Sequence, residues 1–466
     1  MLRARLLRIN KGAVAFLDRH LSGESMNFRQ VIAIIIPLLV DQAFIILLSL
    51  LNTAMVSSSG EAAVAAVGMV DSLNIFLLNV FIALATGGTV VVAQYKGAGN
   101  PQAFSKASAQ AVSAVTIVSL AIFALVVGFH EPLLGLLFGK AERSVLDNAR
   151  IYLVGSGISY PLVGAIEAVS GALRGVGDTK ASLWLSLIKN GLYVLLNFLF
   201  ITVLHMGIMG LVVSLLVSRL LGMLCSLFYI RMIHKTIIFR FLEMLHIDFS
   251  MLKRILFIGI PFAAEQMFFN GGKLLTQIFI VQLGTNALAV NAICNSLSPL
   301  PQIGALACNL AAVTVVGQCI GHGNFKDARK FIRAFLIMGS LSVVVLNILL
   351  LPFLSPLVGL FSPNPKIVPD INTIIYITWA ATPFLWSISF VIPSALRAAG
   401  DVRYTLVVSL ITMWLGRVVL GYILGVVLPF GIMGVWLAMV IEWGIRGIIF
   451  RIRLHGDKWY SHRLLD

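Results

Sequence analysis

The sequence predicts an all-α membrane protein of about twelve transmembrane helices, arranged as two pseudo-symmetric lobes of six helices each. Two observations lead to this prediction. Hydrophobic residues make up 59% of the 466 residues and charged residues only 11%, whereas soluble domains carry roughly 25% charged residues. The motifs of the first half also recur in the second half at a nearly constant distance. A chain with a mean hydropathy of +0.98 therefore exposes much of its surface to lipid.

Apolar stretches define the expected helices, because a helix needs about 20 apolar residues to cross the hydrocarbon core. Clusters of glycine, proline and charge separate these stretches. The expected spans are 29–55, 62–93, 106–130, 146–172, 181–203, 207–231, 253–282, 286–317, 328–352, 370–396, 404–427 and 431–450. They give an N-terminal tail (1–28), an N-lobe (29–231), an inter-lobe linker (232–252), a C-lobe (253–450) and a C-terminal tail (451–466).

The charges predict the orientation of the chain. Its net charge is +15, from 34 Lys and Arg against 19 Asp and Glu. Most basic residues lie in the tails and in short connections on one side of the predicted topology, which the positive-inside rule assigns to the cytoplasm. We expect a multi-pass protein of the bacterial inner (plasma) membrane with both termini cytoplasmic. In a soluble protein this excess would favour nucleic-acid binding; here topology accounts for it, and no nucleic-acid partner is expected.

An internal repeat is visible in the motifs. Pro37…Asp41-Gln42 matches Pro261…Glu265-Gln266 (261 − 37 = 224), Gly60 matches Gly284 and Gln94…Gly97-x-Gly99-Asn100 matches Gln318…Gly321-x-Gly323-Asn324 (both 224), Leu173-Arg174…Gly177-Asp178 matches Leu396-Arg397…Gly400-Asp401 (223), and Gly207…Gly210 matches Gly431…Gly434 (224). Because each repeat contains six spans, both copies enter the membrane in the same direction. Transporters use such parallel repeats to move one half against the other around a central site. We therefore expect a transporter, acting as a monomer on a small-molecule substrate and surrounded by membrane lipid.

Sequence signals for an enzyme or a cofactor are lacking. The cysteines Cys225, Cys294, Cys308 and Cys319 lie in apolar stretches without CxxC spacing, which indicates neither a disulfide framework nor a metal site. There is no Walker motif, HExxH motif or nucleophile elbow. We expect no catalytic residues and no cofactor other than a coupling ion.

Acidic residues within the predicted spans are the first candidates for a functional site, because each costs about 2.5–3.5 kcal/mol on insertion scales. They are Asp41, Asp71, Glu167, Glu265 and Glu442. Asp41 and Glu265 both follow a proline by four residues, and proline breaks the hydrogen bond to the preceding turn. A carboxylate at such a kink can bind a cation or exchange a proton. The alternative is a structural hydrogen bond at a helix interface.

Polar residues in the fifth span add to this candidate site. The spacing of Asn190, Tyr193 and Asn197 places them on one helical face, where they can ligate Na⁺ or relay a proton with Asp41. Asp71 and Glu167 can join the same cavity, although interhelical hydrogen bonds explain such residues equally well.

In the second half, Lys273 follows Glu265 by eight residues, and either charge balance or substrate contact accounts for it. The i,i+4 pair Glu442 and Arg446 with Arg417 on the preceding span predicts an interhelical salt cluster.

Over residues 27–450 the chain resembles the multidrug and toxic compound extrusion (MATE) transporters, in the group that includes polysaccharide and oligosaccharidyl-lipid exporters. The resemblance depends on the Pro37-to-Asp41 span, the Gln94…Asn100 and Leu173…Lys180 connections, Gly207…Gly210 and their second-half copies. It implies two six-helix lobes forming a V, and export of mainly cationic, amphipathic compounds by antiport with H⁺ or Na⁺. Asp41 would then be the coupling carboxylate of the N-lobe.

Two positions depart from the pattern of these transporters. The fifth-span cation motif pairs an Asn with an Asp four residues later, whereas this chain has Tyr193 and Asn197. The loss of one charge disfavours a Na⁺ site at Asp41 and Asn197, so H⁺ is the preferred coupling ion. The C-lobe glutamate of other branches falls at Phe269, so its role is not transferred to Glu265. A flippase of a lipid-linked precursor, or a dedicated exporter of one biosynthetic product, stays the alternative.

Overall fold

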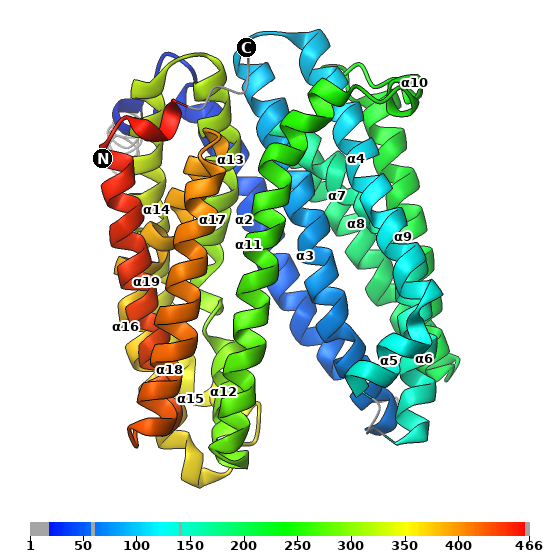
Figure 1. The fold of residues 1–466 in the computed structure, drawn as a ribbon, viewed down its shortest axis with the longest axis vertical. Helices are drawn as coiled ribbons and strands as arrows, with labels where there is room; N and C mark the ends of the chain where they lie inside the picture. The colour runs from blue at the N-terminus through cyan, green and yellow to red at the C-terminus, as the bar shows by residue number, and fades with distance from the viewer. Residues whose placement is uncertain (1–17, 57–60, 139–141, 462–466) are drawn as a thin grey trace, which may run out of the picture. The chain divides into compact units, whose positions relative to one another are not determined.

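The computed structural model describes residues 18–56, 61–138 and 142–461, and their side chains except those of 49–65, Phe138, Phe241 and Leu245. No strand occurs among these residues; they form helices joined by short connections. The chain divides into two compact units. Unit 1 contains the described residues up to Gln42 together with those from Phe268 onward, and unit 2 runs from Ala43 to Met267. The fold is thus the predicted all-α bundle in two halves (Figure 1).

Both borders between the units fall inside a continuous helix. The first cuts α2 (Phe28–Val56) and the second cuts α11 (Phe249–Gln282). The start of each helix therefore groups with the opposite half of the sequence. For α2, one contact of the segment that precedes it explains this grouping: the backbone N–H of Ser25 donates to Asp327 of the second half (2.7 Å).

Unit 2 contains the helices that follow α2 and precede the border in α11. They are α3 (Glu61–Gly97), α4 (Pro101–Gly128), α5 (His130–Phe138), α6 (Arg143–Ile158), α7 (Tyr160–Val176), α8 (Thr179–Asn197) with its π-helical end η2 (Phe198–Val203), α9 (Gly207–Phe228) with η3 (Tyr229–Ile233), and the short α10 (Phe241–Leu245). Within unit 2, α3, α4 and α7 pack against one another, and α8 packs on α9.

Unit 1 contains the remaining helices. They are α12 (Thr285–Leu297), η4 (Leu300–Gln302), α13 (Ile303–Gly321), α14 (Phe325–Leu350), η5 (Leu351–Phe353), α15 (Leu354–Gly359), η6 (Pro365–Ile367), α16 (Val368–Ala398), α17 (Val402–Ile411), η7 (Thr412–Val419), α18 (Leu420–Tyr422), η8 (Ile423–Val427), α19 (Gly431–His455) and η9 (Lys458–Tyr460). Here α13, α14 and α16 pack against one another, and α16 packs on α19. The helices α13, α14 and α16 occupy the repeat positions of α3, α4 and α7.

The membrane-crossing helices agree with the predicted spans. In the described part of the chain, 10 helices are long and apolar enough to cross a membrane, and α6 with α7 forms one further bent pair. The remaining predicted span, 253–282, lies in α11, a continuous helix of 34 residues whose apolar sequence is interrupted by Glu265 and Lys273. At about 1.5 Å per residue this helix exceeds the roughly 30 Å hydrocarbon core. The chain is a multi-pass membrane protein.

The connections of the two halves also match. Three pairs of turn glycines have positive φ, namely Gly99 and Gly323 (69° and 77°), Gly177 and Gly400 (92° and 94°), and Gly207 and Gly431 (55° and 57°). This left-handed conformation favours glycine, which explains their recurrence. Asn100 and Asn324 each cap the next helix by accepting from a backbone N–H at 3.0 Å. Gly60 lies outside the described residues.

The predicted continuous span 146–172 is wrong in one respect, because it is broken. The helices α6 and α7 meet at Ser159 with a bend of 43°. Pro161, near the start of α7, has no N–H to donate and its ring clashes with the preceding turn. The break leaves a polar backbone segment inside unit 2, next to the residues described below.

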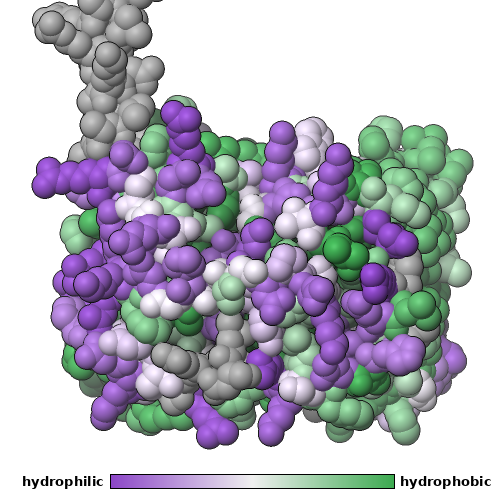
Figure 2. Space-filling model, turned by 90° about the horizontal axis from the view of Figure 1, so that it is seen from above, coloured by the Kyte–Doolittle hydropathy of each residue, from purple (hydrophilic) through white to green (hydrophobic). Residues whose placement is uncertain are grey.

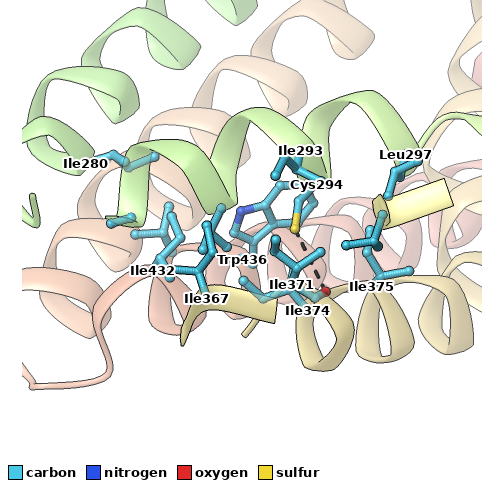
Figure 3. Close-up of a cluster of buried hydrophobic side chains, with 14 of the residues drawn as sticks. Ile280, Ile293, Cys294, Leu297, Ile367, Ile371, Ile374, Ile375, Ile432 and Trp436 are labelled. Atoms are coloured by element: carbon cyan, nitrogen blue, oxygen red, sulfur yellow. Dashed lines mark hydrogen bonds between the residues drawn. The ribbon is translucent and has the colours of Figure 1, made fainter. Parts of the chain in front are cut away.

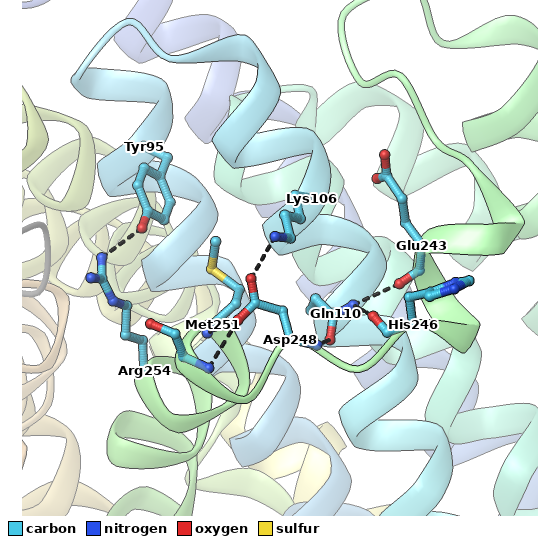
Figure 4. Close-up of polar contacts among 9 residues, drawn as sticks. Tyr95, Lys106, Gln110, Glu243, His246, Asp248, Met251 and Arg254 are labelled. Atoms are coloured by element: carbon cyan, nitrogen blue, oxygen red, sulfur yellow. Dashed lines mark hydrogen bonds and ion pairs between the residues drawn. The ribbon is translucent and has the colours of Figure 1, made fainter.

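The linker between the two repeats is fastened to unit 2 (Figure 4). Gln110 of α4 donates to the carbonyls of Glu243 (2.6 Å) and His246 (2.8 Å) and accepts from the N–H of Asp248 (3.1 Å). Lys106 of α4 binds the Asp248 carboxylate at 2.5 Å, and its hydrogen bond lowers the pKa of that carboxyl. The linker therefore lies against α4 through backbone atoms.

We expect Gln110→Ala to destabilise the protein by about 1–3 kcal/mol, because it leaves two linker carbonyls without their partner. Gln110 is 1% exposed, so water cannot easily replace it. The measurement is the thermal melting temperature of the purified protein. Gln102→Ala is the matched control, since Gln102 lies exposed on the same helix. Equal melting temperatures for the two variants would show that the linker is held by other contacts.

The segment before α2 and the segment after α19 lie at the same end of unit 1, because both contact the start of α14. Asn324, before α14, donates to Glu24 (2.9 Å), and Arg329 in the first turns of α14 donates to Asp457 (2.5 Å), beyond α19. Figure 2 looks onto this end and shows hydrophilic side chains gathered across it. An even number of membrane crossings accounts for this arrangement. Of the predicted tail 1–28, only residues from Asp18 are described.

Candidate functional site

The two proline-containing helices each carry a buried carboxylate. Pro37 lies inside α2 and Pro261 inside α11. One turn later Asp41 is 5% exposed and Glu265 is 9% exposed. Asp41 belongs to unit 1, and Glu265 belongs to unit 2. The remaining candidates of the first half, namely Asp71, Glu167, Asn190, Tyr193 and Asn197, all lie in unit 2.

A hydrogen-bonded cluster in unit 2 surrounds Asp71. Oδ1 of Asp71, on α3, accepts from the hydroxyl of Tyr152 at 2.7 Å and from Nδ2 of Asn74 at 3.2 Å. Oδ1 of Asn74 in turn accepts from the hydroxyl of Tyr160 at 2.7 Å. The two tyrosines lie on either side of the break between α6 and α7. Asp71 is thus linked by hydroxyl groups to the bend of a broken helix.

A cation belongs to the same cluster. Arg219, on α9, donates through a short contact to Oγ of Ser159, the residue at the break. Its guanidinium also acts electrostatically on Tyr152, Tyr193 and Asp71. Broken membrane helices expose polar backbone that is tolerated where it lines a cavity or is buried in protein. Here Arg219 is the cation that lies at such a break, near Asp71.

The predicted polar face of the fifth span is present on α8. Asn190 donates to Oγ of Ser186 at 3.2 Å, and Asn197, four residues after Tyr193, is buried. Tyr193 lies close enough to Tyr152 of the Asp71 cluster for the two side chains to interact electrostatically. Thus α8 places one polar residue, Tyr193, near the cluster.

Glu167 has a different partner from the other candidates. Its carboxylate lies 3.6 Å from Nζ of Lys189 on α8, and both side chains are about one-fifth exposed. The pair ties α7 to α8 inside unit 2. At this distance Lys189 balances most of the charge that Glu167 brings into the span.

Unit 1 contains a pocket of about 300 Å³ between α11, α12, η7 and α19. It is lined by Lys273, Thr276, Gln277, Ile280, Asn291, Asn295, Arg417, Val435, Trp436 and Met439. Two of these side chains are cationic and none is acidic. Its volume lies at the lower end of the range for small-molecule sites.

The predicted salt cluster is present behind this pocket. Glu442 is 0% exposed, and its carboxylate lies 3.4 Å from Arg417 and 3.3 Å from Arg446. Lys273, Arg417 and Arg446 also surround the ring of Phe269 at 4.9, 5.2 and 6.0 Å from its centroid. The Glu442 carboxylate therefore pairs with two cations and the Phe269 ring contacts three, and the formal charge of the group is 3 − 1 = +2.

One wall of the pocket is rigid. Trp436 is 4% exposed, belongs to the buried core of unit 1 and donates to Oδ1 of Asn291 at 3.2 Å. Figure 3 shows it among isoleucine side chains from α11, α12, α16 and α19. Nδ2 of Asn291 donates to Gln277 at 2.9 Å. The indole and the two amides are thus held in place by packing and by each other.

Reasoning from the sequence missed Arg219 and the break at Ser159. Both had a signal. An arginine in a membrane helix is as unusual as a carboxylate, and Pro161 marks the interruption of the predicted span. The pocket in unit 1 had a weaker signal, because Lys273 and Arg417 are 144 residues apart (417 − 273) and only the fold brings them together.

A comparison with protein families finds the MatE model twice in this chain, at residues 37–199 and 261–423. The two matches are offset by 261 − 37 = 224 and 423 − 199 = 224 residues, which is the distance between the sequence motifs. The match begins in each half at the proline that precedes the buried carboxylate.

Curated relatives match nearly the whole chain. The "Uncharacterized transporter YisQ" of Bacillus subtilis is 26% identical over 430 residues, covering 91% of this chain and 93% of that protein. The "Probable multidrug resistance protein NorM" of Thermotoga maritima is 24% identical over 445 residues, covering 94% of each.

Solved structures share the fold. One of these structures is a MOP superfamily transporter from Pyrococcus furiosus, reported under the words "Reverse polarity of binding pocket suggests different function". It superposes with a TM-score of 0.84 at 18% identity, covering 91% of this chain and 95% of that one. A "MATE in the bent conformation" gives 0.82 at 19% identity, covering 95% and 97%. At this identity the likeness establishes the common architecture.

Proposed function

Because the chain belongs to the MATE family of transporters, we propose that it is a secondary active antiporter, which exports small amphipathic organic compounds in exchange for a cation. Its setting is the bacterial inner membrane, with both termini in the cytoplasm. The observation that carries the proposal is the buried carboxylate Asp41, one turn after the proline in the first helix of the repeat. A charged group in such a helix is costly to insert, and reversible binding of a cation gives it a use.

H⁺ is the coupling ion that we propose. A Na⁺ site needs several oxygen ligands and benefits from negative charge, and the fifth helix offers Tyr193 and Asn197 instead of a second carboxylate. The Asp71 cluster supports the choice of H⁺, because the hydroxyl of Tyr152 donates directly to the Asp71 carboxylate at 2.7 Å and can exchange a proton with it. In this proposal Asp41 binds the proton, and the Asp71 cluster forms the polar interior of unit 2.

One alternative keeps support from a specific observation. The pocket in unit 1 carries two cationic side chains and no acidic one, as an exporter dedicated to one acidic product, or a flippase of a phosphate-containing lipid precursor, would require. Both alternatives use the same bundle. Neither alternative requires that an imposed ion gradient drive the transport of a broad range of compounds.

The test is uptake into inverted vesicles, with an imposed pH gradient compared with an imposed Na⁺ gradient. Ethidium serves as a fluorescent organic cation and 2-naphthoate as a fluorescent organic anion. We expect the pH gradient to drive accumulation of at least one of them, and a protonophore to abolish it. Accumulation driven only by Na⁺ would overturn the choice of H⁺. No accumulation under either gradient, by protein shown to be folded, would favour the dedicated exporter or the flippase.

A further inference from the structure

The pocket in unit 1 has the charge of an anion-binding site. We propose that it binds the negatively charged group of the exported compound, so that the substrates of this transporter include aromatic organic anions. This rests on the proposed export function for its physiological meaning, but the binding itself does not depend on the coupling ion. It differs from the mainly cationic substrates that the resemblance to MATE transporters implies.

The charge balance supports this inference. Arg417 and Arg446 share the single carboxylate of Glu442, so this group retains a net positive charge. Lys273 adds a further cation, and none of the described carboxylates lies within ion-pair distance of it. An uncompensated buried charge is costly unless a partner or water stabilises it. An anion in the pocket supplies the missing partner.

The donors also fit an anion. Nε of Arg417 has no hydrogen-bond partner among the described residues, and guanidinium groups bind carboxylates with well-defined geometry. Lys273 on α11 and Arg417 line the pocket together with the polar side chains of Thr276, Asn291 and Asn295. Arg417 lies on the π-helical segment η7, a type of irregular helix that recurs at functional sites.

The apolar lining selects an organic anion over an inorganic one. Trp436, Ile280, Val435 and Met439 also line the pocket, and the first three belong to the buried core. The hydrophobic part of an aromatic acid can lie against this apolar lining while its carboxylate reaches the cations. With about 300 Å³ available, a bicyclic aromatic acid fits the pocket.

A purely structural role explains only part of this arrangement. The salt cluster accounts for Glu442, Arg446 and one edge of Arg417. It accounts neither for Lys273, whose contact with the Phe269 ring at 4.9 Å leaves its charge unbalanced, nor for a lining with two cations and no acid.

The test measures binding of 2-naphthoate and of its neutral analogue 2-naphthamide to the purified full-length protein by isothermal titration calorimetry. We expect the acid to bind at least roughly tenfold more tightly than the amide. Lys273→Met should lose roughly tenfold in affinity for the acid while leaving the amide unchanged, and Lys273→Arg should restore it. Lys326→Met is the matched control, because Lys326 is exposed on α14 outside the pocket.

The outcomes separate this inference from the proposed function. Equal affinity for the acid and the amide would overturn it, and this comparison needs no variant to fold. Unchanged binding of the acid by folded Lys273→Met would also overturn it. If a pH gradient drives ethidium efflux while naphthoate does not bind, the antiport proposal stands and the pocket assignment fails. If naphthoate binds through Lys273 but no gradient drives transport, the pocket assignment stands and antiport fails.

Discussion

Asp41→Asn is expected to abolish gradient-driven accumulation in inverted vesicles while the protein still folds and inserts. Asparagine has nearly the shape of aspartate but cannot ionise, so the position can no longer exchange a proton. Because Asp41 is 5% exposed in a helix that already contains Pro37, removal of its charge also lowers the cost of insertion. We expect a fall in the initial rate of uptake to the level of empty vesicles, at least on the order of a hundredfold, as is usual when an essential proton-transfer group is lost.

The matched control is Asp370→Asn, because Asp370 is exposed at the start of α16. This variant should transport like the wild type. Melting temperature and membrane yield have to be measured for both variants, so that loss of transport is separated from loss of fold. Uptake at the wild-type rate by Asp41→Asn would remove the coupling role from this residue and direct attention to Asp71 and Glu265.

Glu442→Gln is expected to give the largest loss of stability. The carboxylate is 0% exposed and is the only described acidic partner of Arg417 and Arg446. Without it, two guanidinium groups and Lys273 remain in one region with no opposite charge. Breaking a buried ion pair by removing one partner costs about 3–5 kcal/mol, which corresponds to a fall in melting temperature on the order of 10 °C.

The control for Glu442→Gln is another glutamate in an ion pair. Glu131 lies 2.7 Å from Arg150, but both side chains are more than half exposed, and such surface pairs contribute about 0–1 kcal/mol. Glu131→Gln should therefore change the melting temperature little. A similar small change for Glu442→Gln would mean that water or an anion already compensates the two arginines.

Most of the architecture was predictable from the sequence because the repeat constrains it. Membrane helices need long apolar stretches, and the turns between them need glycine at positions such as Gly177 and Gly400, so hydropathy and glycine spacing predict the helices and their connections. The salt cluster of Glu442 with Arg446 was predictable for the same reason, since both residues lie on one face of one helix.

The parts that could not be predicted depend on contacts distant in the sequence. Hydropathy does not distinguish a straight helix from one broken at Ser159. Nor does it show that the start of α2 groups with the second half of the chain. The pocket of Lys273 and Arg417 also depends on how α11 packs against η7. The cation-coupling role of Asp41, Asn190, Tyr193 and Asn197 stays a prediction.

The division of the chain inside α2 and α11 has a mechanical consequence. The linker is fastened to α4, and the chain passes between the units only within these two helices, at Gln42–Ala43 and Met267–Phe268. Any change of angle between the units must therefore bend these two helices. Each helix lacks a backbone hydrogen bond at a proline one to two turns earlier, which makes it easier to bend. Asp41 and Glu265 lie within two residues of these crossings. In the proposed function, a proton that binds Asp41 would therefore act within two residues of the point where this helix passes from one unit to the other.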